Sequence, residues 1–401
     1  MSEVAVMRLI NADQLPSYWT GNSEGEDCLQ VGNPLVVEFL SELSKEILSD
    51  KSCREYPDVI TFGYFCRKSA VKLALEERGN ISNFFGWGKA VHISPSNVPV
   101  NFAFSFVFGL LSGNSNLVRL PSVHWPQIDL LVGLIEKVSS RKEFLFLRNM
   151  NTFVRTERED PNLNTIISSC DALIVWGGDN TVARFRQLPK KPRCVELYFP
   201  DRISSLIVNS VAINKLSDDS IIELANSFFN DTYLVDNNAC SSPRKIIWVG
   251  DEIETCEAKN KFWRAINQTL ISKKYDLNVV AKIDKYLDVL TLVSHLHNSI
   301  RVRKYSEDIW VSDHNDGIVA GRLGSYRENT FSTIEKALSA LDKDEQTLTY
   351  YGFNIDKLRE LILNTNVFVD RVVPVGMALE IGFYWDGIDV LQRLSKRMNF
   401  V

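Results

Sequence analysis

Cys240 is the residue whose surroundings best suit nucleophilic chemistry. It lies in the segment YLVDNNACSSPRKIIWV, in a polar loop between an expected helix and an expected strand. A cysteine attacks a carbonyl only as its thiolate, which backbone N–H groups, helix termini and nearby cations stabilise. The chain has seven cysteines, and the commonest role for any one of them is a small buried side chain, as we expect for Cys170 and Cys194 beside apolar runs. From its own segment alone, Cys240 is therefore more easily interpreted as a small buried side chain than as a nucleophile.

Asn97 is a second candidate, in the segment HISPSNVPVNF. There an expected strand ends, a proline-rich turn follows, and a helix begins after Pro99. An amide at such a junction can donate its NH₂ group to a ligand beyond the carboxyl ends of parallel strands. Without further context an N-cap or Asx-turn role is favoured. His92, inside the same strand, is expected to be a packed side chain.

Two further positions could contribute to a site. Gly177 and Gly178 follow the run ALIVW and precede an expected helix, so a nucleotide could approach the backbone there, although the segment does not match GxGxxG. Glu196 lies inside the apolar strand CVELY, where a carboxylate needs a buried partner or a function. Most single glutamates in strands face water at the end of a sheet.

Short buried strands alternating with helices would position these residues. We expect strands at Ala90–Ser94, Asn116–Leu120, Phe144–Arg148, Ala172–Trp176 and Cys194–Tyr198, which carry the runs AVHIS, NLVRL, FLFLR, ALIVW and CVELY. Helices are expected after Asn97, Trp125, Pro161 and Asp179. This β-α-β alternation predicts a parallel sheet with helices on both faces, as in Rossmann-type nucleotide-binding folds.

The remaining segments suggest a cover and a second α/β unit. Helical patterns at Pro34–Leu48 and Ser69–Glu77 place an N-terminal helical cover at residues 1–85, packed on a dinucleotide-binding domain at 86–209. A second α/β domain that carries Cys240 is expected at 210–390, with a helix at Leu216–Phe229, the strand KIIWV and a long helical pattern up to Ser272. The segment from Asn366 contains a strand-like NVFVDRVV, a turn and a closing helix DVLQRLSKRM, and residues 391–401 form a C-terminal tail.

Composition limits the partners and the compartment. Among the 401 residues 45% are hydrophobic and 24% charged, which is typical of a globular protein. A net charge of −5 gives no overall attraction to nucleic acid, so neither nucleic acid nor an anionic membrane is expected as a partner. No apolar run reaches the roughly 18 residues of a membrane span, and no signal peptide is visible. Seven scattered cysteines without CxxC or zinc spacing predict a reducing, cytoplasmic location and no bound metal.

The order and spacing of four segments resemble the aldehyde dehydrogenase superfamily, and within it the LuxC-type acyl-CoA reductases, also called long-chain fatty-acyl-CoA reductases. The segments are GWGKAVHISPSNVPVNFAFSFVFGLLSGNSNLVRLPS at 86–122, DALIVWGGDNTV at 171–182, DNNACSSPRKI at 236–246 and DRVVPVGMALEIGFYWDGIDVLQRLSKR at 370–397. The first and third are the specific ones. The resemblance covers the chain from about Phe85 onward.

This resemblance implies a covalent mechanism. Cys240 resembles the family's nucleophile, which accepts the acyl group from CoA or another thioester donor, such as one delivered by an acyl ligase or a carrier protein. Asn97 matches the side-chain amide that stabilises the oxyanion together with the cysteine N–H. Glu196 occupies the position of the superfamily's general base, but the segment LYFPDR replaces the glycine-rich run that follows there, which leaves its role open.

The resemblance also implies a nicotinamide cofactor. Arg119 and Ser122, in VRLPS, match the region that holds the adenine ribose, and an arginine there suits the 2′-phosphate of NADPH, while NADH remains an alternative. The other positions that it assigns to cofactor binding are Ser94, Pro95, Gly177, Gly178 and Thr181.

The predicted activity is NADPH-dependent reduction of an acyl thioester to an aldehyde. One alternative is an oxidising aldehyde or semialdehyde dehydrogenase that uses Glu196 to activate water. Another is a cysteine acyltransferase or hydrolase that uses no nicotinamide, and a third is a non-catalytic relative that presents acyl groups to a partner. Both a monomer and a homo-oligomer remain open.

Overall fold

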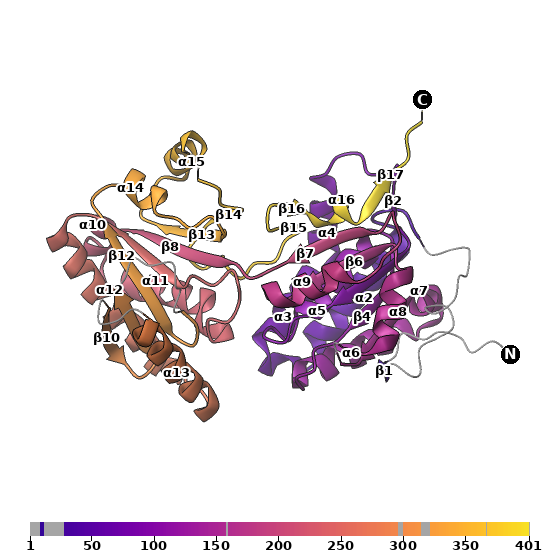
Figure 1. Cartoon of the computed structure of the whole chain (residues 1–401), viewed down its shortest axis with the longest axis horizontal. Coiled ribbons are helices and arrows are strands. Elements are labelled where there is room, and N and C mark those ends of the chain that lie inside the picture. The colour runs from indigo at the N-terminus through magenta and orange to yellow at the C-terminus, as the bar shows by residue number, and fades with distance from the viewer. Residues whose placement is uncertain are drawn as a thin grey trace. The chain divides into compact units, whose positions relative to one another are not determined.

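The computed structural model describes residues 9–11, 28–157, 159–295, 300–313, 321–365 and 367–400, which form two compact units (Figure 1). The first unit contains residues 1–201 and 381–401, and the second contains residues 202–380. The expected boundary at 209/210 lies eight residues later than this division. The difference arises because the strand Ile203–Asn209 pairs with strands of the second unit.

The sheet of the first unit is parallel throughout. Its strand order is β1-β5-β4-β3-β6-β7. The strands are β1 (Leu9–Asn11), β3 (Lys89–Ile93), β4 (Ser115–Arg119), β5 (Asn151–Arg155), β6 (Ala172–Trp176) and β7 (Val195–Phe199). Their carboxyl ends therefore meet at one edge, where α/β folds bind ligands.

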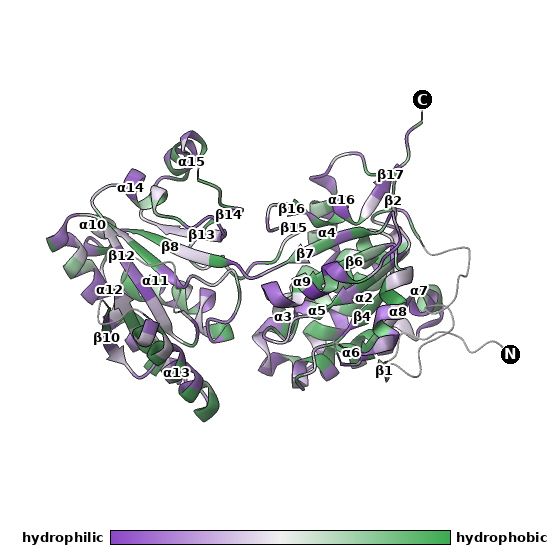
Figure 2. Ribbon diagram, viewed as in Figure 1, coloured by the Kyte–Doolittle hydropathy of each residue, from purple (hydrophilic) through white to green (hydrophobic). Residues whose placement is uncertain are grey.

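Helices cover both faces of this sheet, because successive strand residues face opposite sides. On one face, Ala90 and Val118 pack with α2 (Pro34–Ser49), α3 (Pro57–Phe65), α5 (Asn101–Leu111) and α6 (Pro126–Ser139). On the other face, Val91 and Leu117 pack with α8 (Pro161–Ser169) and α9 (Asp179–Gln187). The short helix α4 (Lys68–Glu76) follows α3, and Figure 2 shows hydrophobic residues concentrated along α5.

A buried polar network joins α5 to the sheet. Asn116 donates from Nδ2 to the Asn151 side chain, so its Oδ1 must accept from Nε2 of His92 at 2.9 Å. Nδ1 of His92 then accepts from Ser105 Oγ at 2.7 Å, and Ser105 in turn accepts from Trp176 Nε1. Burial lowers the pKa of His92 to about 4, so the ring is neutral. The prediction that His92 is a packed side chain is confirmed.

The expected strand Phe144–Arg148 is wrong. Leu145–Met150 is a helix, α7, and the strand that follows it is β5. Leu147 and Met150, three residues apart, are buried, whereas Leu145 and Phe146 are exposed. A short apolar run can pack as either element, and here the helical spacing of two buried side chains decides it.

The sheet of the second unit has the order β10-β11-β12-β9-β8-β13-β14, with every pair parallel except the antiparallel β10 and β11. The strands are β8 (Ile203–Asn209), β9 (Lys245–Val249), β10 (Arg301–Ser306), β11 (Ile309–Asp313), β12 (Ser325–Phe331), β13 (Glu345–Tyr351) and β14 (Arg371–Pro374). One face packs on α11 (Asp218–Asp231) and α12 (Glu252–Ser272), and the other on α14 (Ile334–Ser339) and α15 (Ile355–Asn364). Two further helices are α10 (Ser210–Asn214) and α13 (Val279–His295).

A buried carboxylate links this sheet to α12. Glu328 Oε1 accepts hydrogen bonds from the indole N–H groups of Trp248 and Trp263, at 3.0 and 2.6 Å. Its other oxygen lies 3.2 Å from Lys259 Nζ. Because both oxygens have partners, the charge is accommodated in the core.

The C-terminal segment differs from the expected closing helix. The helix α16 is limited to Val390–Arg393, and Ser395–Arg397 forms the strand β17, which pairs antiparallel with β2 (Phe84–Gly86). A hairpin of β15 (Tyr384–Trp385) and β16 (Ile388–Asp389) precedes α16. In the segment VFVDRVV only the last three residues are in a strand, β14, which ends one residue later at Pro374, and Asn366 lies outside the described residues.

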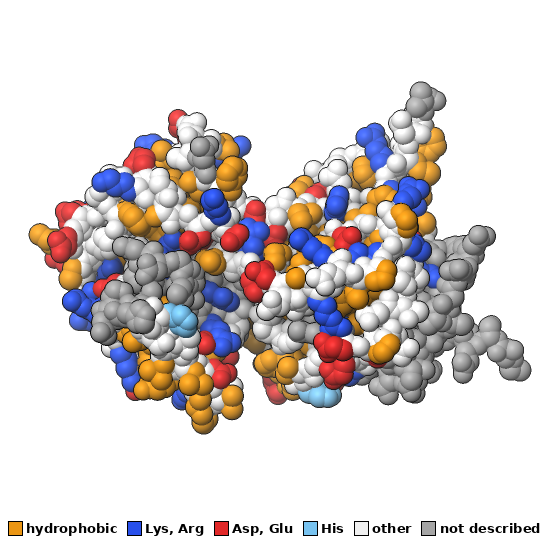
Figure 3. All heavy atoms as spheres, viewed as in Figure 1, with side chains coloured by type: hydrophobic (Ala, Val, Ile, Leu, Met, Phe, Trp, Pro, Cys, Tyr) orange, Lys and Arg blue, Asp and Glu red, His pale blue; other side chains and the backbone are white. Residues whose placement is uncertain are grey.

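The surface carries both signs of charge. On the face drawn in Figure 3, Lys and Arg side chains are interspersed with Asp and Glu side chains. Such a surface has no large field of one sign on that face. Within the described part of the chain, no helix combines the length and the hydropathy that crossing a bilayer would need.

Candidate active site

In the second unit, Cys240 lies in a tightly held loop before β9. Asp236 and Asn237 both have left-handed backbone conformations, with φ of 51° and 56°. Such conformations cost about 1 kcal/mol or more each for residues other than glycine, among which Asp and Asn tolerate them best, and they are frequent at functional sites. The Asp236 carbonyl oxygen accepts from Leu323 N–H, and its carboxylate accepts from the Tyr275 hydroxyl at 2.7 Å. The turn is thus fixed on both sides.

The backbone of Cys240 is attached to the amino ends of two strands. Ser204 Oγ donates to the Cys240 carbonyl oxygen at 2.6 Å and accepts from the Thr347 N–H at 3.1 Å. The Cys240 residue itself is partly buried. All seven cysteines are described, and none of them forms a disulfide. The loop therefore holds Cys240, a partly buried residue, at the amino ends of β8 and β13.

A buried ionisable cluster lies at the same edge. Glu345, the first residue of β13, is fully buried, and neither of its carboxylate oxygens has a hydrogen-bond partner among the described residues. Desolvation raises the pKa of Glu345 to about 7, against the opposing attraction of the Lys245 ammonium. Lys245 Nζ itself donates to the Ala340 carbonyl oxygen at 2.7 Å.

Replacing Glu345 with glutamine is expected to stabilise the protein at pH 8.5 and to leave its stability unchanged near pH 4. The folded state holds the Glu345 proton up to about pH 7, whereas the unfolded chain releases it near 4.5. The wild type therefore loses stability as pH rises between these values, by at most on the order of 3 kcal/mol. Urea unfolding of both proteins at pH 4, 6 and 8.5 measures the difference. An equal difference at all three pH values would show that Glu345 does not titrate in this range.

In the first unit, Ser94, Pro95 and Asn97 follow the carboxyl end of β3. Ser94 is 1% exposed, and its hydroxyl has no hydrogen-bond partner among the described residues. The turn that follows is fixed by Trp125, whose indole N–H donates to the Ser96 carbonyl oxygen at 3.3 Å. Asn97 is exposed on this turn, four residues before α5 begins. A ligand could form hydrogen bonds with the buried hydroxyl of Ser94 and with the exposed amide of Asn97.

Arg119 is fully buried at the end of β4. Its Nε donates to the Thr156 carbonyl oxygen at 3.1 Å and one terminal nitrogen to Ser122 Oγ at 2.7 Å. The guanidinium thus joins the loops that follow β4 and β5. Arg119 therefore supports the loops of the expected ribose-binding region from inside the protein, and its charge does not lie at the surface of that region.

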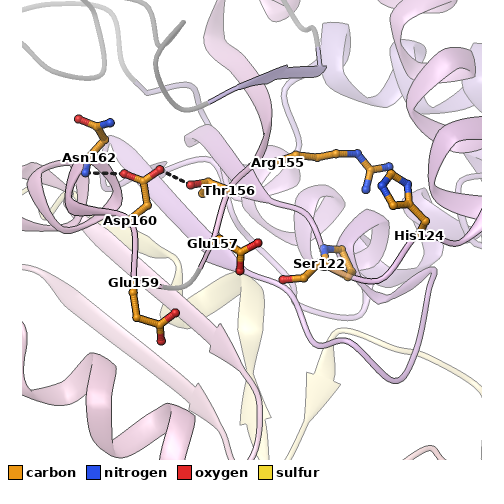
Figure 4. A pocket seen from close by; sticks show the side chains of 9 residues that line it. Ser122, His124, Arg155, Thr156, Glu157, Glu159, Asp160 and Asn162 are labelled. Carbon is orange, nitrogen blue, oxygen red and sulfur yellow. Dashed lines mark hydrogen bonds between the residues drawn. The ribbon is translucent and has the colours of Figure 1, made fainter.

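A cavity of about 670 Å³ opens beside these loops. It is lined by Pro121, Ser122, His124, Arg155, Thr156, Glu157, Glu159, Asp160 and Asn162 (Figure 4). His124 and Arg155 lie together at one end, and the acidic side chains lie toward the other. Asp160 accepts from the Asn162 N–H at 2.8 Å, so it already caps α8. Of the lining residues, only Ser122 is predicted from the sequence.

The Gly177–Gly178 turn connects β6 to α9. A side chain at Gly178 would come within 2.7 Å of the Asp201 carboxylate, which accepts from the Asp179 N–H at 3.2 Å. A side chain at Gly177 would crowd Thr181. Local packing therefore favours glycine at both positions. The start of α9 already faces a carboxylate, which weakens the expectation of a phosphate at that helix end.

Glu196 is engaged near the amino end of β7. Its carboxylate accepts from the Tyr198 hydroxyl and lies 3.2 Å from Lys190 Nζ. It lies three positions before the last residue of the strand, or about 10 Å along the extended chain. The carboxylate is thus bound to local partners and lies away from the carboxyl edge.

The structure therefore gathers six predicted residues at the carboxyl edge of the first sheet, after β3, β4 and β6. They are Ser94, Pro95, Asn97, Ser122, Gly177 and Gly178, with Arg119 beneath them and Thr181 in the first turn of α9. Cys240 belongs to the second unit. The lining residues after β5 are absent from the prediction because the strand that precedes them was expected at Phe144–Arg148. The run NTFVR followed by the polar TERED is the signal for that strand end.

Similarity to known structures defines the class of fold. Aldehyde dehydrogenase 21 from Physcomitrella patens matches with a TM-score of 0.66 at 13% identity, over 90% of this chain and 84% of that one. Methylmalonate-semialdehyde dehydrogenase from Oceanimonas doudoroffii matches with a TM-score of 0.68 at 12% identity, over 95% and 86%. The chain has an aldehyde dehydrogenase fold, which confirms the expected fold class.

The family follows from the sequence match. The family model "Acyl-CoA reductase (LuxC)" matches residues 74–397, so the chain belongs to the LuxC acyl-CoA reductase family. A long-chain acyl-protein thioester reductase of Photobacterium phosphoreum is 22% identical over 78% of this chain and 62% of its own length. Long-chain acyl-protein thioester reductase 2 of Photobacterium leiognathi is 25% identical over 42% of this chain and 33% of its own. The match spans less than two thirds of either relative.

Proposed function

We propose that this protein reduces an acyl thioester to an aldehyde with NADPH, through an acyl group carried on Cys240. The observation that carries the proposal is the family match over residues 74–397, which includes the loop that holds Cys240. The names of the two relatives point to acyl thioesters as substrates. The backbone of the Cys240 loop adds a local argument, since Ser204 fixes it while the Cys240 residue is only partly buried.

Cys240 is proposed to exchange one thioester for another. Its thiolate attacks the acyl carbon, a carbon–sulfur bond to Cys240 forms, and the bond to the donor sulfur breaks with release of the donor thiolate. The acyl group then remains attached while the donor departs, so the reduction proceeds on a bound carbonyl. After reduction the Cys240–carbon bond breaks, and aldehyde and thiolate are released.

Asn97 is proposed to donate its side-chain N–H to the carbonyl oxygen when that oxygen becomes negative. A donor of this kind is typically worth about 10² to 10³ in rate. Glu196 has no proton-transfer step in this scheme, because its carboxylate is already engaged by Tyr198 and Lys190 and reductive release requires no activated water.

The carboxyl edge of the first sheet fits a dinucleotide. The 670 Å³ cavity and the orphaned Ser94 hydroxyl supply space and an unused polar group there. A reduced nicotinamide would supply the hydride that converts the acyl group to the aldehyde. Ser122, His124 and Arg155 would hold the nucleotide, and the Arg155 guanidinium, which lies 2.5 Å from the Asp129 carboxylate, would share its charge with a 2′-phosphate. NADH is the alternative, because Glu157 and Glu159 line the same cavity.

Incubation with an acyl-CoA in the absence of any dinucleotide tests the covalent step. We expect one acyl adduct by mass spectrometry, on the peptide that contains Cys240, and no adduct in Cys240→Ala. Cys256→Ala, which removes an exposed thiol on α12, is the matched control and should still be acylated. An adduct on another cysteine, or equal labelling of the Cys240→Ala protein, would overturn the proposal. An acylated carrier protein offered in parallel compares the two classes of donor.

A further inference from the structure

Two cysteine thiols lie in contact at the amino edge of the first sheet. Cys170 ends α8 two residues before β6, and Cys194 directly precedes β7. Their sulfur atoms are 3.6 Å apart. β6 and β7 are neighbouring parallel strands with Ala172 opposite Val195, so the sheet itself keeps the two thiols together. This edge is opposite the one that carries the proposed dinucleotide site.

The two thiols have different surroundings. Cys170 is 1% exposed in the core beside α8 and α9, whereas Cys194 is partly exposed. The hydrogen bond from the Cys170 thiol lowers the pKa of Cys194 and outweighs burial and the nearby Glu196 and Asp171 carboxylates, which act to raise it, while the Lys190 ammonium adds to the lowering. The same hydrogen bond, together with burial, raises the pKa of Cys170. Cys194 is therefore the thiol that ionises first, with Cys170 as its hydrogen-bond donor.

We propose that Cys170 and Cys194 form a reversible disulfide in response to a peroxide, with Cys194 oxidised first and Cys170 as the resolving thiol. In the first step the Cys194 thiolate attacks hydrogen peroxide, a sulfur–oxygen bond forms, the oxygen–oxygen bond breaks and hydroxide leaves. In the second step the Cys170 sulfur attacks the Cys194 sulfur, the disulfide forms and water leaves. Over both steps the two thiols lose two protons and two electrons, and hydrogen peroxide becomes two molecules of water.

The geometry requires only a small movement. The sulfur atoms must approach from 3.6 Å to about 2.05 Å. We expect rotation of the two cysteine side chains to bring them together, since both lie at the amino ends of the paired strands β6 and β7. The closed loop would contain β6, the Gly177–Gly178 turn and α9. Oxidation is therefore expected to restrict local opening of that segment and to raise the melting temperature of the protein.

Peptide mapping after treatment with hydrogen peroxide tests the proposal. The experiment uses the full chain as Cys240→Ala, with the wild type in parallel, so that its outcome does not depend on the proposed function. We expect a cross-linked peptide pair containing residues 170 and 194, lighter by two hydrogen atoms than the reduced pair and restored by a phosphine reductant. A disulfide between any other pair, or none while exposed cysteines are oxidised, would overturn the proposal.

Single variants test the order of the steps. In Cys170→Ser, dimedone should trap a sulfenic acid on Cys194, forming about tenfold faster than one on the exposed Cys256. In Cys194→Ser, no trapped product is expected on Cys170. Cys256→Ser should keep the cross-link unchanged. Trapping on Cys170 in place of Cys194 would contradict the assigned order even if the disulfide forms.

Discussion

Cys240→Ala is expected to abolish reduction of an acyl thioester, with a loss of turnover on the order of 10⁴-fold or more. Removal of the nucleophile from an enzyme with a covalent intermediate typically has an effect of this size. The protein should still fold, because Cys240 is partly exposed and its contact with Ser204 uses the backbone carbonyl oxygen, which alanine retains. Oxidation of NADPH in the presence of an acyl-CoA, followed by absorbance, measures the loss.

The control for this prediction separates catalysis from binding. NADPH should raise the melting temperature of Cys240→Ala and of the wild type equally, because the proposed nucleotide site consists of residues of the first unit. If Cys240→Ala retains more than about a tenth of wild-type turnover, Cys240 is not the nucleophile. If NADPH stabilises neither protein, a cysteine acyltransferase or hydrolase becomes the better hypothesis.

The strands β3, β4 and β6 of the first unit were predictable because they are buried on both faces. Ala172–Trp176 is the clearest case, since all five residues of β6 are buried and the run ALIVW has no polar member. The strands β3 and β4 are likewise buried at all five positions, and the polar side chains of His92 and Asn116 within them are hydrogen-bonded to each other. Parallel strands with helices on both faces have continuous apolar runs. The helices between them have apolar residues at every third or fourth position.

The errors occur where a tertiary contact decides between two local structures. Phe144–Arg148 and the segment at 390–397 both have apolar residues that suit either a helix or a strand. In the second case, pairing of Ser395–Arg397 with β2, more than 300 positions away in the sequence, ends the helix after Arg393. A sequence pattern contains no information about which distant strand edge is unpaired.

The sequence predicts where the candidate site residues lie along the strands and loops, but not which side chains they contact. Spacing places Arg119, Ser122 and Gly178 at strand ends correctly, because every strand end in a parallel sheet lies at one edge. It does not reveal that Arg119 is buried beneath that edge or that Asp201 faces the start of α9. These pairings join loops that are distant in the chain, and they decide whether a charge is available to a ligand.

Asn97→Ala is expected to lower kcat by about 10² to 10³ with little change in KM, because the amide is proposed to act on the oxyanion and not on the ground-state thioester. The side chain is exposed, so its truncation should leave the melting temperature within about a degree of that of the wild type. Asn97→Asp is the sharper comparison, since it keeps the size of the side chain but replaces the N–H donor by a negative charge, and it should lower kcat at least as far as alanine does. Steady-state reduction of an acyl-CoA and the rate of acyl-Cys240 formation should fall together in both variants. A kcat within twofold of the wild type in Asn97→Asp would exclude oxyanion stabilisation by residue 97.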